Sequence, residues 1–212
     1  MDRRRFLLAF PAGAASVLIG EAAAPQAGRA AAANTVDIHA ILDDPDAPVG
    51  GDPTGDVTIV AFIDYNCPFC KRAEPDLQRL VASDGKIRLV YKDWPILARS
   101  SVTGARLALA ANYQGKYEPA HAALMALHGR SSDAAMRAAV ASAGVDIARL
   151  DKDLDAHGDA IMDCLRRNGT QANALHLQGT PVYLVGPYLV AASLNYDQFS
   201  DVVAKFRAQI GK

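Results

Sequence analysis

The pattern of apolar residues predicts a strand, a helix and a second strand in the first half of the chain. Residues 57–63 (VTIVAFI) form a continuous apolar run rich in β-branched side chains, which is typical of a buried strand, and residues 87–91 form another. Between the two runs, apolar residues recur at helical spacing over residues 73–81, and Gly85 ends this helix.

The second half of the chain predicts helices first and strands afterwards. Residues 98–177 contain no β-rich run, and their apolar residues recur at helical spacing, so we expect four or five helices there. Two short β-rich runs, 179–185 and 188–190, predict a hairpin, and a final helical pattern starts at Asp197. The breaks between the helices of the block are expected at glycines: Gly115, Gly129, Gly144, Gly158 and Gly169.

The order is therefore β-α-β, a helical block, and β-β-α, which predicts an α/β fold with an inserted all-helical subdomain. We expect the core in residues 57–97 and 178–212 and the insertion in residues 98–177. Residues 34–56 are acidic and rich in turn formers, so they predict a lead-in segment with one helical turn near 36–42.

Residues 1–33 predict an export signal. Arginines at 3–5 precede a short apolar stretch at 6–10, and small, alanine-rich residues follow. This is the order of a secretory signal peptide, and the Asp-Arg-Arg-Arg-Phe-Leu start also resembles the twin-arginine pattern. The apolar stretch is too short for a transmembrane helix. We therefore expect an exported chain, cleaved after Ala24 or within residues 30–33.

Composition narrows the function classes. The 212 residues are 50% hydrophobic and 21% charged, with a formal net charge of −1. This balance excludes a disordered chain and gives no overall basic attraction to nucleic acid. The three cysteines are too few for a disulfide-rich scaffold or a four-cysteine zinc site, and we expect no metal.

The pair Cys67 and Cys70 is the strongest chemical signal. Cys67 falls where the first strand ends and the helix begins, so free amides and the helix dipole favour its thiolate, which is the nucleophile. Pro68 suits the first helical position. Cys70 lies inside the first turn and is expected to be less exposed. Half of a zinc site and an inert structural disulfide are the alternatives, but an exported strand–CxxC–helix segment favours redox exchange.

Gly179-Thr180-Pro181 begins the third predicted strand. A proline at the head of a strand donates no ladder hydrogen bond. If the Thr180–Pro181 bond is cis, it fixes a tight turn and leaves backbone groups free for an extended substrate. An ordinary trans proline at a strand edge is the alternative.

Together these residues resemble the thioredoxin superfamily, and within it the exported DsbA-like thiol:disulfide oxidoreductases. The resemblance implies a thioredoxin-like fold in which Cys67 attacks and Cys70 is its buried partner. It also implies that Pro181 is a cis-proline packed against the disulfide and that Thr180 lies in the substrate groove. The similarity covers nearly the whole mature chain and is carried by residues 44–49, 64–71, 91–97 and 179–181.

Two positions depart from the family pattern. The family often has a buried acid six residues before the first cysteine, where this chain has Ala61. Asp64 and Lys92 are candidate substitutes, although solvated positions at strand ends are the simpler expectation for both. Pro68 and Phe69 occupy the positions where the family tunes redox potential. Phe69 replaces the His of the strongest oxidants, so we expect a milder oxidant.

The remaining candidates are given structural interpretations. Cys164 lies on a helical segment and is expected to be an inert core thiol, with an intermolecular disulfide or a reactive thiol as alternatives. The histidines are scattered, and we assign none of them a catalytic role: His39, His121, His128, His157 and His176.

The resemblance implies a periplasmic enzyme that needs no cofactor beyond the Cys67–Cys70 disulfide. Its expected partners are cysteine-containing exported proteins and a membrane redox protein, either a quinone-linked oxidase or a thiol donor. The short lead-in favours a monomeric oxidase. The alternatives are an isomerase or reductase kept reduced by a membrane thiol donor, and a chaperone-like binding module whose disulfide is structural.

Overall fold

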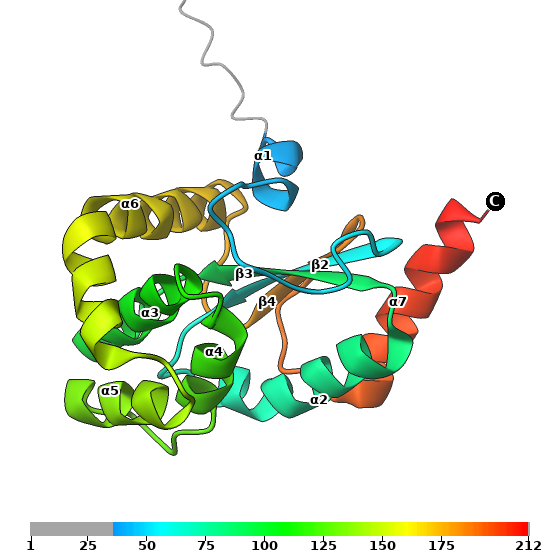
Figure 1. Ribbon diagram of the computed structural model, residues 1–212. Helices are drawn as coiled ribbons and strands as arrows, with labels where there is room; N and C mark the ends of the chain where they lie inside the picture. Colours follow the sequence, from blue (N-terminus) through cyan, green and yellow to red (C-terminus); the bar gives the residue numbers. More distant parts are fainter. Residues whose placement is uncertain (1–35, 212) are drawn as a thin grey trace, which may run out of the picture. The chain divides into compact units, whose positions relative to one another are not determined.

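Five strands form one mixed sheet in the computed structural model, which describes residues 36–211 (Figure 1). The strand order is β1-β3-β2-β4-β5, with β2 and β3 parallel and every other pair antiparallel. The hairpin predicted after the helical block is confirmed as β4 and β5. The strands are β1 Val49–Gly51, β2 Val57–Ile63, β3 Ile87–Asp93, β4 Val182–Val185 and β5 Tyr188–Val190.

Helices cover both faces of the sheet. One face packs on α2 and α7, and the other packs on α1 and the later turns of α6 (Figure 1). The insertion is confirmed as helical and places α3, α4 and α5 beside the sheet. The helices are α1 Ile38–Leu42, α2 Pro68–Asp84, α3 Arg99–Asn112, α4 Tyr117–Met125, α5 Asp133–Ser142, α6 Ile147–Ala174 and α7 Tyr196–Ile210.

The continuous apolar run of β2 reflects burial on both faces. Ile59, Ala61 and Ile63 belong to the core with α2 and α7, whereas Val60 and Phe62 belong to the core with α1 and α6. Successive side chains of a strand point to opposite faces, so a central strand covered twice needs apolar residues throughout. This two-sided burial fixes the end of β2, where the cysteine pair begins.

Two details of the sequence prediction are wrong. The lead-in contains the expected helical turn, α1, but also the strand β1, which pairs with β3. Three residues that include two glycines carry no β-rich signal. Gly158 and Gly169 do not end helices, because both lie within the 28 residues of α6. An interior glycine costs only about 1 kcal/mol relative to alanine, which the packing of α6 on α3 and β3 offsets.

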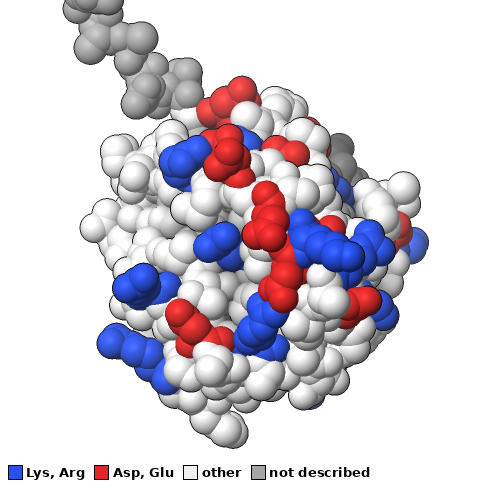
Figure 2. Space-filling view, turned by 60° about the vertical axis from the view of Figure 1, so that its left-hand side comes forward, with Lys and Arg blue, Asp and Glu red and all other residues white. Residues whose placement is uncertain are grey.

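The leader predicted for residues 1–33 lies outside the described residues. In the part of the chain that the structure describes, no helix has the length and apolarity to cross a bilayer. On the face drawn in Figure 2, acidic and basic side chains are interspersed, in keeping with the small net charge.

Candidate active site

Cys67 is the N-cap residue of α2. Its backbone is extended, its Sγ accepts a hydrogen bond from the Cys70 amide at 3.4 Å, and Pro68 takes the first helical position. An N-cap side chain satisfies an amide that the helix leaves free, and sulfur replaces the usual oxygen here. The capping geometry therefore aims helix amides and the positive end of the dipole at the Cys67 sulfur.

The surroundings of Cys67 favour its thiolate. The hydrogen bond from the Cys70 thiol is the largest cause, and with help from Thr180 and backbone amides it outweighs burial and lowers the Cys67 pKa to about 6. At pH 7 about 90% of this group is then thiolate, the form that attacks disulfides.

Cys70 has the opposite character. Its side chain is buried, with 1% of the residue exposed, and burial raises the pKa of its thiol well above the usual value. Both cysteines are thiols in the structure. One sulfur therefore ionises readily while its partner resists ionisation.

The backbone of Thr180 lies against Cys67. The Cys67 thiol donates to the Thr180 carbonyl oxygen at 3.1 Å, and the Thr180–Pro181 peptide bond is cis. The Thr180 hydroxyl oxygen is buried and has no hydrogen-bond partner within residues 36–211, so it can donate to a thiolate at Cys67. A cavity of about 320 Å³ extends from these residues along Leu177 and Leu189.

Pro68 and Phe69, the two residues between the cysteines, are exposed. Phe69 is 51% exposed, and the Arg72 guanidinium lies 5.3 Å from the centre of its ring. The Phe69 carbonyl accepts a hydrogen bond from the Ser193 hydroxyl at 2.9 Å, which ties the first turn of α2 to the segment before α7.

Asp64 and Lys92 are not solvated, contrary to the simpler expectation for both. Asp64 is 1% exposed, and its carboxylate accepts backbone hydrogen bonds from three amides, those of Asn66, Ile96 and Leu97. These bonds hold the loop before Cys67 against the loop after β3. Lys92 is 0% exposed, and its ammonium lies 2.6 Å from Asp44 on the α1 and α6 side of the sheet. Both side chains are held by structural contacts.

The sequence reading missed a buried polar cluster that joins α2 to the inserted helix α4. His121 Nε2 lies 2.9 Å from Glu74 Oε1, and His121 Nδ1 lies 3.0 Å from the Tyr65 hydroxyl. Asp93 accepts hydrogen bonds from the Tyr117 hydroxyl at 3.1 and 3.2 Å. The sequence did contain a signal for Glu74 and His121, because each of them interrupts an apolar helical stripe.

The charges in this cluster depend on one another. Burial opposes the charge of Glu74, but the adjacent His121 lowers the pKa of this carboxyl, and in return Glu74 raises the pKa of His121 against burial. Burial raises the pKa of Asp93 to about 6. The cluster therefore holds a carboxylate–imidazolium pair beside a second carboxyl group that titrates near neutral pH.

Cys164 is buried, as predicted. It is 3% exposed, its Sγ lies 3.8 Å from the Asp46 carbonyl oxygen, and burial raises its pKa to about 11. A thiol with these properties is a poor nucleophile. Across residues 36–211 there is no group of three or more His, Cys, Asp or Glu side chains arranged to hold a metal ion.

The thioredoxin family model matches residues 43–205, which include the cysteine pair, the helical insertion and the cis-proline. The chain belongs to the thioredoxin family. The match spans α3 to α6 as well as the two segments of the core.

Solved structures refine this assignment. The chain is similar to a thioredoxin-like oxidoreductase from Silicibacter pomeroyi, with 39% identity and a TM-score of 0.75 over 80% of this chain and 97% of that one. It is also similar to the thiol-disulfide exchange protein α-DsbA2 from Wolbachia pipientis, with 27% identity and a TM-score of 0.74 over 79% and 90%. A periplasmic thioredoxin-like protein from Salmonella enterica shares 29% identity, with a TM-score of 0.70 over 79% and 94%. These matches place the chain among DsbA-like thiol:disulfide oxidoreductases.

The curated relatives are much longer than this chain. They include Na(+)/H(+) antiporter NhaA 1 of a Mycobacterium species, 27% identical over 140 residues, and NhaA 1 of Salinispora arenicola, 29% identical over 170 residues. The alignments cover 65% and 76% of this chain but only 23% and 25% of those proteins. The chain thus spans about a quarter of their length.

Proposed function

We propose that this protein is an exported disulfide oxidase. Its Cys67–Cys70 disulfide is transferred to pairs of cysteines in exported proteins, and a quinone-linked membrane protein then restores it. In the transfer, a substrate thiolate attacks Cys67, the Cys67–Cys70 bond breaks, and a mixed disulfide forms. A second substrate thiolate displaces Cys67, so that the substrate is oxidised and the pair is reduced.

The observation that carries this proposal is the position of the Cys67 sulfur at the N-cap of α2, 3.4 Å from the Cys70 amide, because these surroundings lower the Cys67 pKa. A thiolate exists only in the reduced protein, so whatever stabilises it favours reduction of the pair and makes the disulfide a better oxidant. With a pKa of about 6, the thiolate stabilises the reduced form at pH 7 by about 1.4 kcal/mol, or about 30 mV for two electrons.

This contribution is modest, which agrees with a mild oxidant. The Phe69 side chain offers no hydrogen-bond donor or positive charge to the sulfur, and the nearby Arg72 guanidinium lies over the Phe69 ring. The donors to Cys67 come from the Cys70 thiol, the Thr180 hydroxyl and backbone amides. We expect a reduction potential well below the most oxidising value of the superfamily, about −120 mV.

The cavity beside the cis-proline supports an extended polypeptide as the substrate. Its walls include the apolar side chains of Leu177 and Leu189 next to Thr180, and the Cys67 sulfur lies within reach of the same backbone. An unfolded exported chain offers both apolar residues and free cysteines. We propose that the protein acts as a monomer in the periplasm, and the relative from Salmonella described as periplasmic supports this location.

Two refolding assays test the proposal. The oxidised protein is mixed with a reduced protein that needs several disulfides, and recovery of that protein's activity is followed. A scrambled form of the same substrate tests isomerisation. Cys67→Ala is the inactive control and Cys164→Ala the matched control, because it removes a buried thiol remote from Thr180. We expect oxidative refolding to depend on Cys67 and not on Cys164.

The outcomes separate the competing functions. Rescue of the scrambled substrate without oxidation of the reduced one would identify an isomerase or reductase. If neither assay responds while Cys67→Ala still prevents aggregation of an unfolded protein, the groove is a binding module. A Cys67 pKa near 8.5, measured by thiolate absorbance, contradicts the activated thiol on which the proposal depends.

A further inference from the structure

Cys70 must gain and lose a proton during exchange. When a substrate thiolate attacks Cys67, the electron pair of the broken S–S bond leaves on Cys70 Sγ, in a site where burial strongly favours the neutral thiol. The Cys70 sulfur therefore takes up one proton. In the reverse step, the Cys70 thiol gives up that proton before it attacks a mixed disulfide at Cys67.

The buried groups nearest in sequence do not supply this proton. Asp64 directs its carboxylate to three backbone amides, and residue 61 is alanine. Lys92 is paired with Asp44 on the other side of the sheet. The side chains of Asp64 and Lys92 are thus both engaged in structural contacts.

Glu74 is the acid on the face of α2 that carries Cys70. The two residues are four positions apart, which places their Cβ atoms about 5–6 Å from each other. Glu74 is 7% exposed and lies 2.9 Å from His121 Nε2. Burial raises the pKa of the Tyr183 phenol on β4, and the charges of Cys70, Glu74 and Cys67 raise it further, so the three groups lie near the same side chain.

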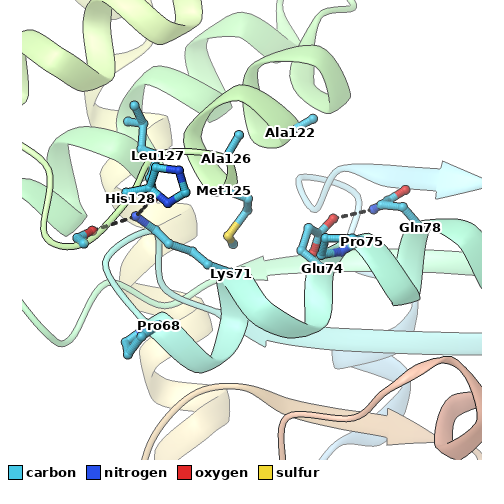
Figure 3. Close-up of a pocket in the computed structure, with 11 residues that line it drawn as sticks. Pro68, Lys71, Glu74, Pro75, Gln78, Ala122, Met125, Ala126, Leu127 and His128 are labelled. Carbon is cyan, nitrogen blue, oxygen red and sulfur yellow. Dashed lines mark hydrogen bonds between the residues drawn. The ribbon is translucent and has the colours of Figure 1, made fainter.

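A groove connects Glu74 to solvent. It lies between α2 and α4, has a volume of about 500 Å³, and Glu74, Pro75 and Gln78 form part of its wall (Figure 3). The Gln78 amide donates to Glu74 Oε1 at 2.6 Å along this wall. Pro75 has no N–H, so the Lys71 carbonyl lacks its helical donor at this turn. A groove of this size holds several water molecules.

We propose that Glu74 and His121 form a proton relay for Cys70. The imidazolium proton of His121 passes through the Glu74 carboxylate to the Cys70 thiolate, and His121 is left neutral. Water in the groove between α2 and α4 then returns a proton to the pair. When Cys70 attacks, each transfer runs in the opposite direction. This relay rests on the proposed thiol–disulfide exchange and explains how a buried sulfur takes part in it.

Other groups around His121 set its proton affinity. The charged and titratable groups that face it are Glu74 on α2, Tyr91 and Asp93 on β3, Tyr65 after β2, and Tyr117 and Glu118 on α4. Burial opposes the imidazolium, but the carboxyl groups of Glu74, Asp93 and Glu118 outweigh burial and raise the His121 pKa, so the imidazole holds a proton that it can donate.

The test measures the step in which Cys70 attacks. Reduced protein is mixed rapidly with rising concentrations of oxidised glutathione, and samples are quenched with acid. At saturation the rate is that of Cys70 displacing glutathione from Cys67. We expect Glu74→Gln to slow this step about 100-fold at pH 7 and to remove the ionisation of the relay from its pH profile. The rate at which Cys67 attacks glutathione disulfide should change less than about threefold.

Three variants control this experiment. Glu74→Asp retains the carboxyl group and should recover most of the rate. His121→Gln should slow the same step and covers the case in which Glu74→Gln does not fold. Asp76→Asn removes one negative charge from the same helix, at a surface ion pair with Arg79, and should change nothing.

The relay is overturned if Glu74→Gln and His121→Gln resolve the mixed disulfide at the wild-type rate. A slower rate with an unchanged pH profile also overturns it, because a merely displaced Cys70 gives that result. If the wild-type protein itself does not exchange disulfides through Cys67, the proposed function fails and the relay fails with it. Normal wild-type exchange with unaffected variants removes the relay alone.

Discussion

Two consecutive residues of β3 enter two different buried charge clusters, one on each side of the sheet. Lys92 lies 2.6 Å from Asp44, and the Asp44 carboxylate also accepts two hydrogen bonds of 2.9 Å from Arg167. Asp93 points to the opposite side, where it accepts hydrogen bonds from Tyr117 close to His121. Both residues are almost fully buried, at 0% and 1% exposed.

The clusters differ in how their charges match. On the Lys92 side, two cations face two carboxylates, and the hydrogen bonds from Arg167 and Lys92 overcome burial and lower the pKa of Asp44. On the Asp93 side, two buried carboxyl groups share one imidazole, and burial raises the pKa of Asp93 to about 6. In the matched cluster each carboxylate lies within hydrogen-bond distance of a cation, whereas the unmatched cluster contains a carboxyl group, Asp93, that exchanges its proton near pH 6. Lys92 and Asp93 are equally buried, but the cluster around Lys92 holds paired charges that stabilise the fold, whereas the cluster around Asp93 can take up and release a proton.

The largest expected effect comes from breaking the matched cluster. Lys92→Met leaves the buried Asp44 carboxylate with only Arg167, and we expect the free energy of unfolding to fall by about 4 kcal/mol. Urea denaturation of the reduced protein at pH 7 measures this loss. The double variant Asp44→Asn, Lys92→Met removes both charges and should recover much of it. A loss below about 1 kcal/mol for Lys92→Met contradicts the structural role.

The two clusters should also contribute with opposite signs to the pH dependence of the free energy of unfolding, which is a smaller effect. Asp93→Asn and Asp44→Asn measure these contributions. Folded Asp93 keeps its proton up to a pH of about 6, whereas the unfolded carboxyl loses it near 3.8. The folded state binds more protons between these values, so the Asp93 contribution to stability decreases as the pH rises through this window. The full shift corresponds to about 3 kcal/mol. The free energy of unfolding of Asp93→Asn should therefore rise by about 3 kcal/mol relative to that of the wild type between pH 3.5 and pH 7.

Asp44→Asn provides the matched comparison. The pKa of folded Asp44 is lowered from 3.8, so its contribution is present above that value and is lost as the pH falls through the folded pKa. Relative to wild type, Asp44→Asn should therefore lose stability as the pH rises to about 3.8 and stay constant above it, so the series for this variant extends below pH 3.5. Urea midpoints at half-unit pH intervals measure both differences. If the stability of both variants relative to wild type changes in the same direction as the pH rises, the proposed difference between the clusters is wrong.

Tyr117→Phe tests the hydrogen bonds that support Asp93. The hydroxyl donates to both Asp93 oxygens, so its loss leaves the carboxylate less well solvated and should cost about 1.5 kcal/mol at pH 7. The cost should shrink below pH 5, where Asp93 is protonated. Stability measured at the two pH values checks this. A pH-independent loss indicates that only packing of the ring was changed.

The fold and the cysteine site could be predicted from the sequence because their signals are local. The apolar run of β2, the N-cap position of Cys67 and the Thr180–Pro181 pair each occupy a few adjacent residues. β1 was missed because a strand of three residues with two glycines depends on its pairing with β3.

The second charge cluster was missed because its members are distant in sequence. Glu74, Asp93 and His121 come from a helix of the core, a strand end and the insertion. Each is visible as a polar residue in an apolar pattern, but only the packing of α4 on α2 brings the His121 imidazole to the Glu74 carboxylate. For the same reason, the sequence did not indicate that Lys92 is buried.

The smallest effect is expected at Cys164, which lies beside the matched cluster. Its thiol has charged neighbours on this side in Lys92, Asp44 and Arg167, and burial raises its pKa to about 11, so it remains neutral. Cys164→Ala removes one buried sulfur and should cost about 1 kcal/mol in urea denaturation. The reduction potential of the Cys67–Cys70 pair, measured in glutathione buffers, should not change. A shifted potential would mean that the sheet face with Lys92 and Cys164 influences the face with the cysteine pair. The two clusters would then not be independent, and the contrast drawn between them would be wrong.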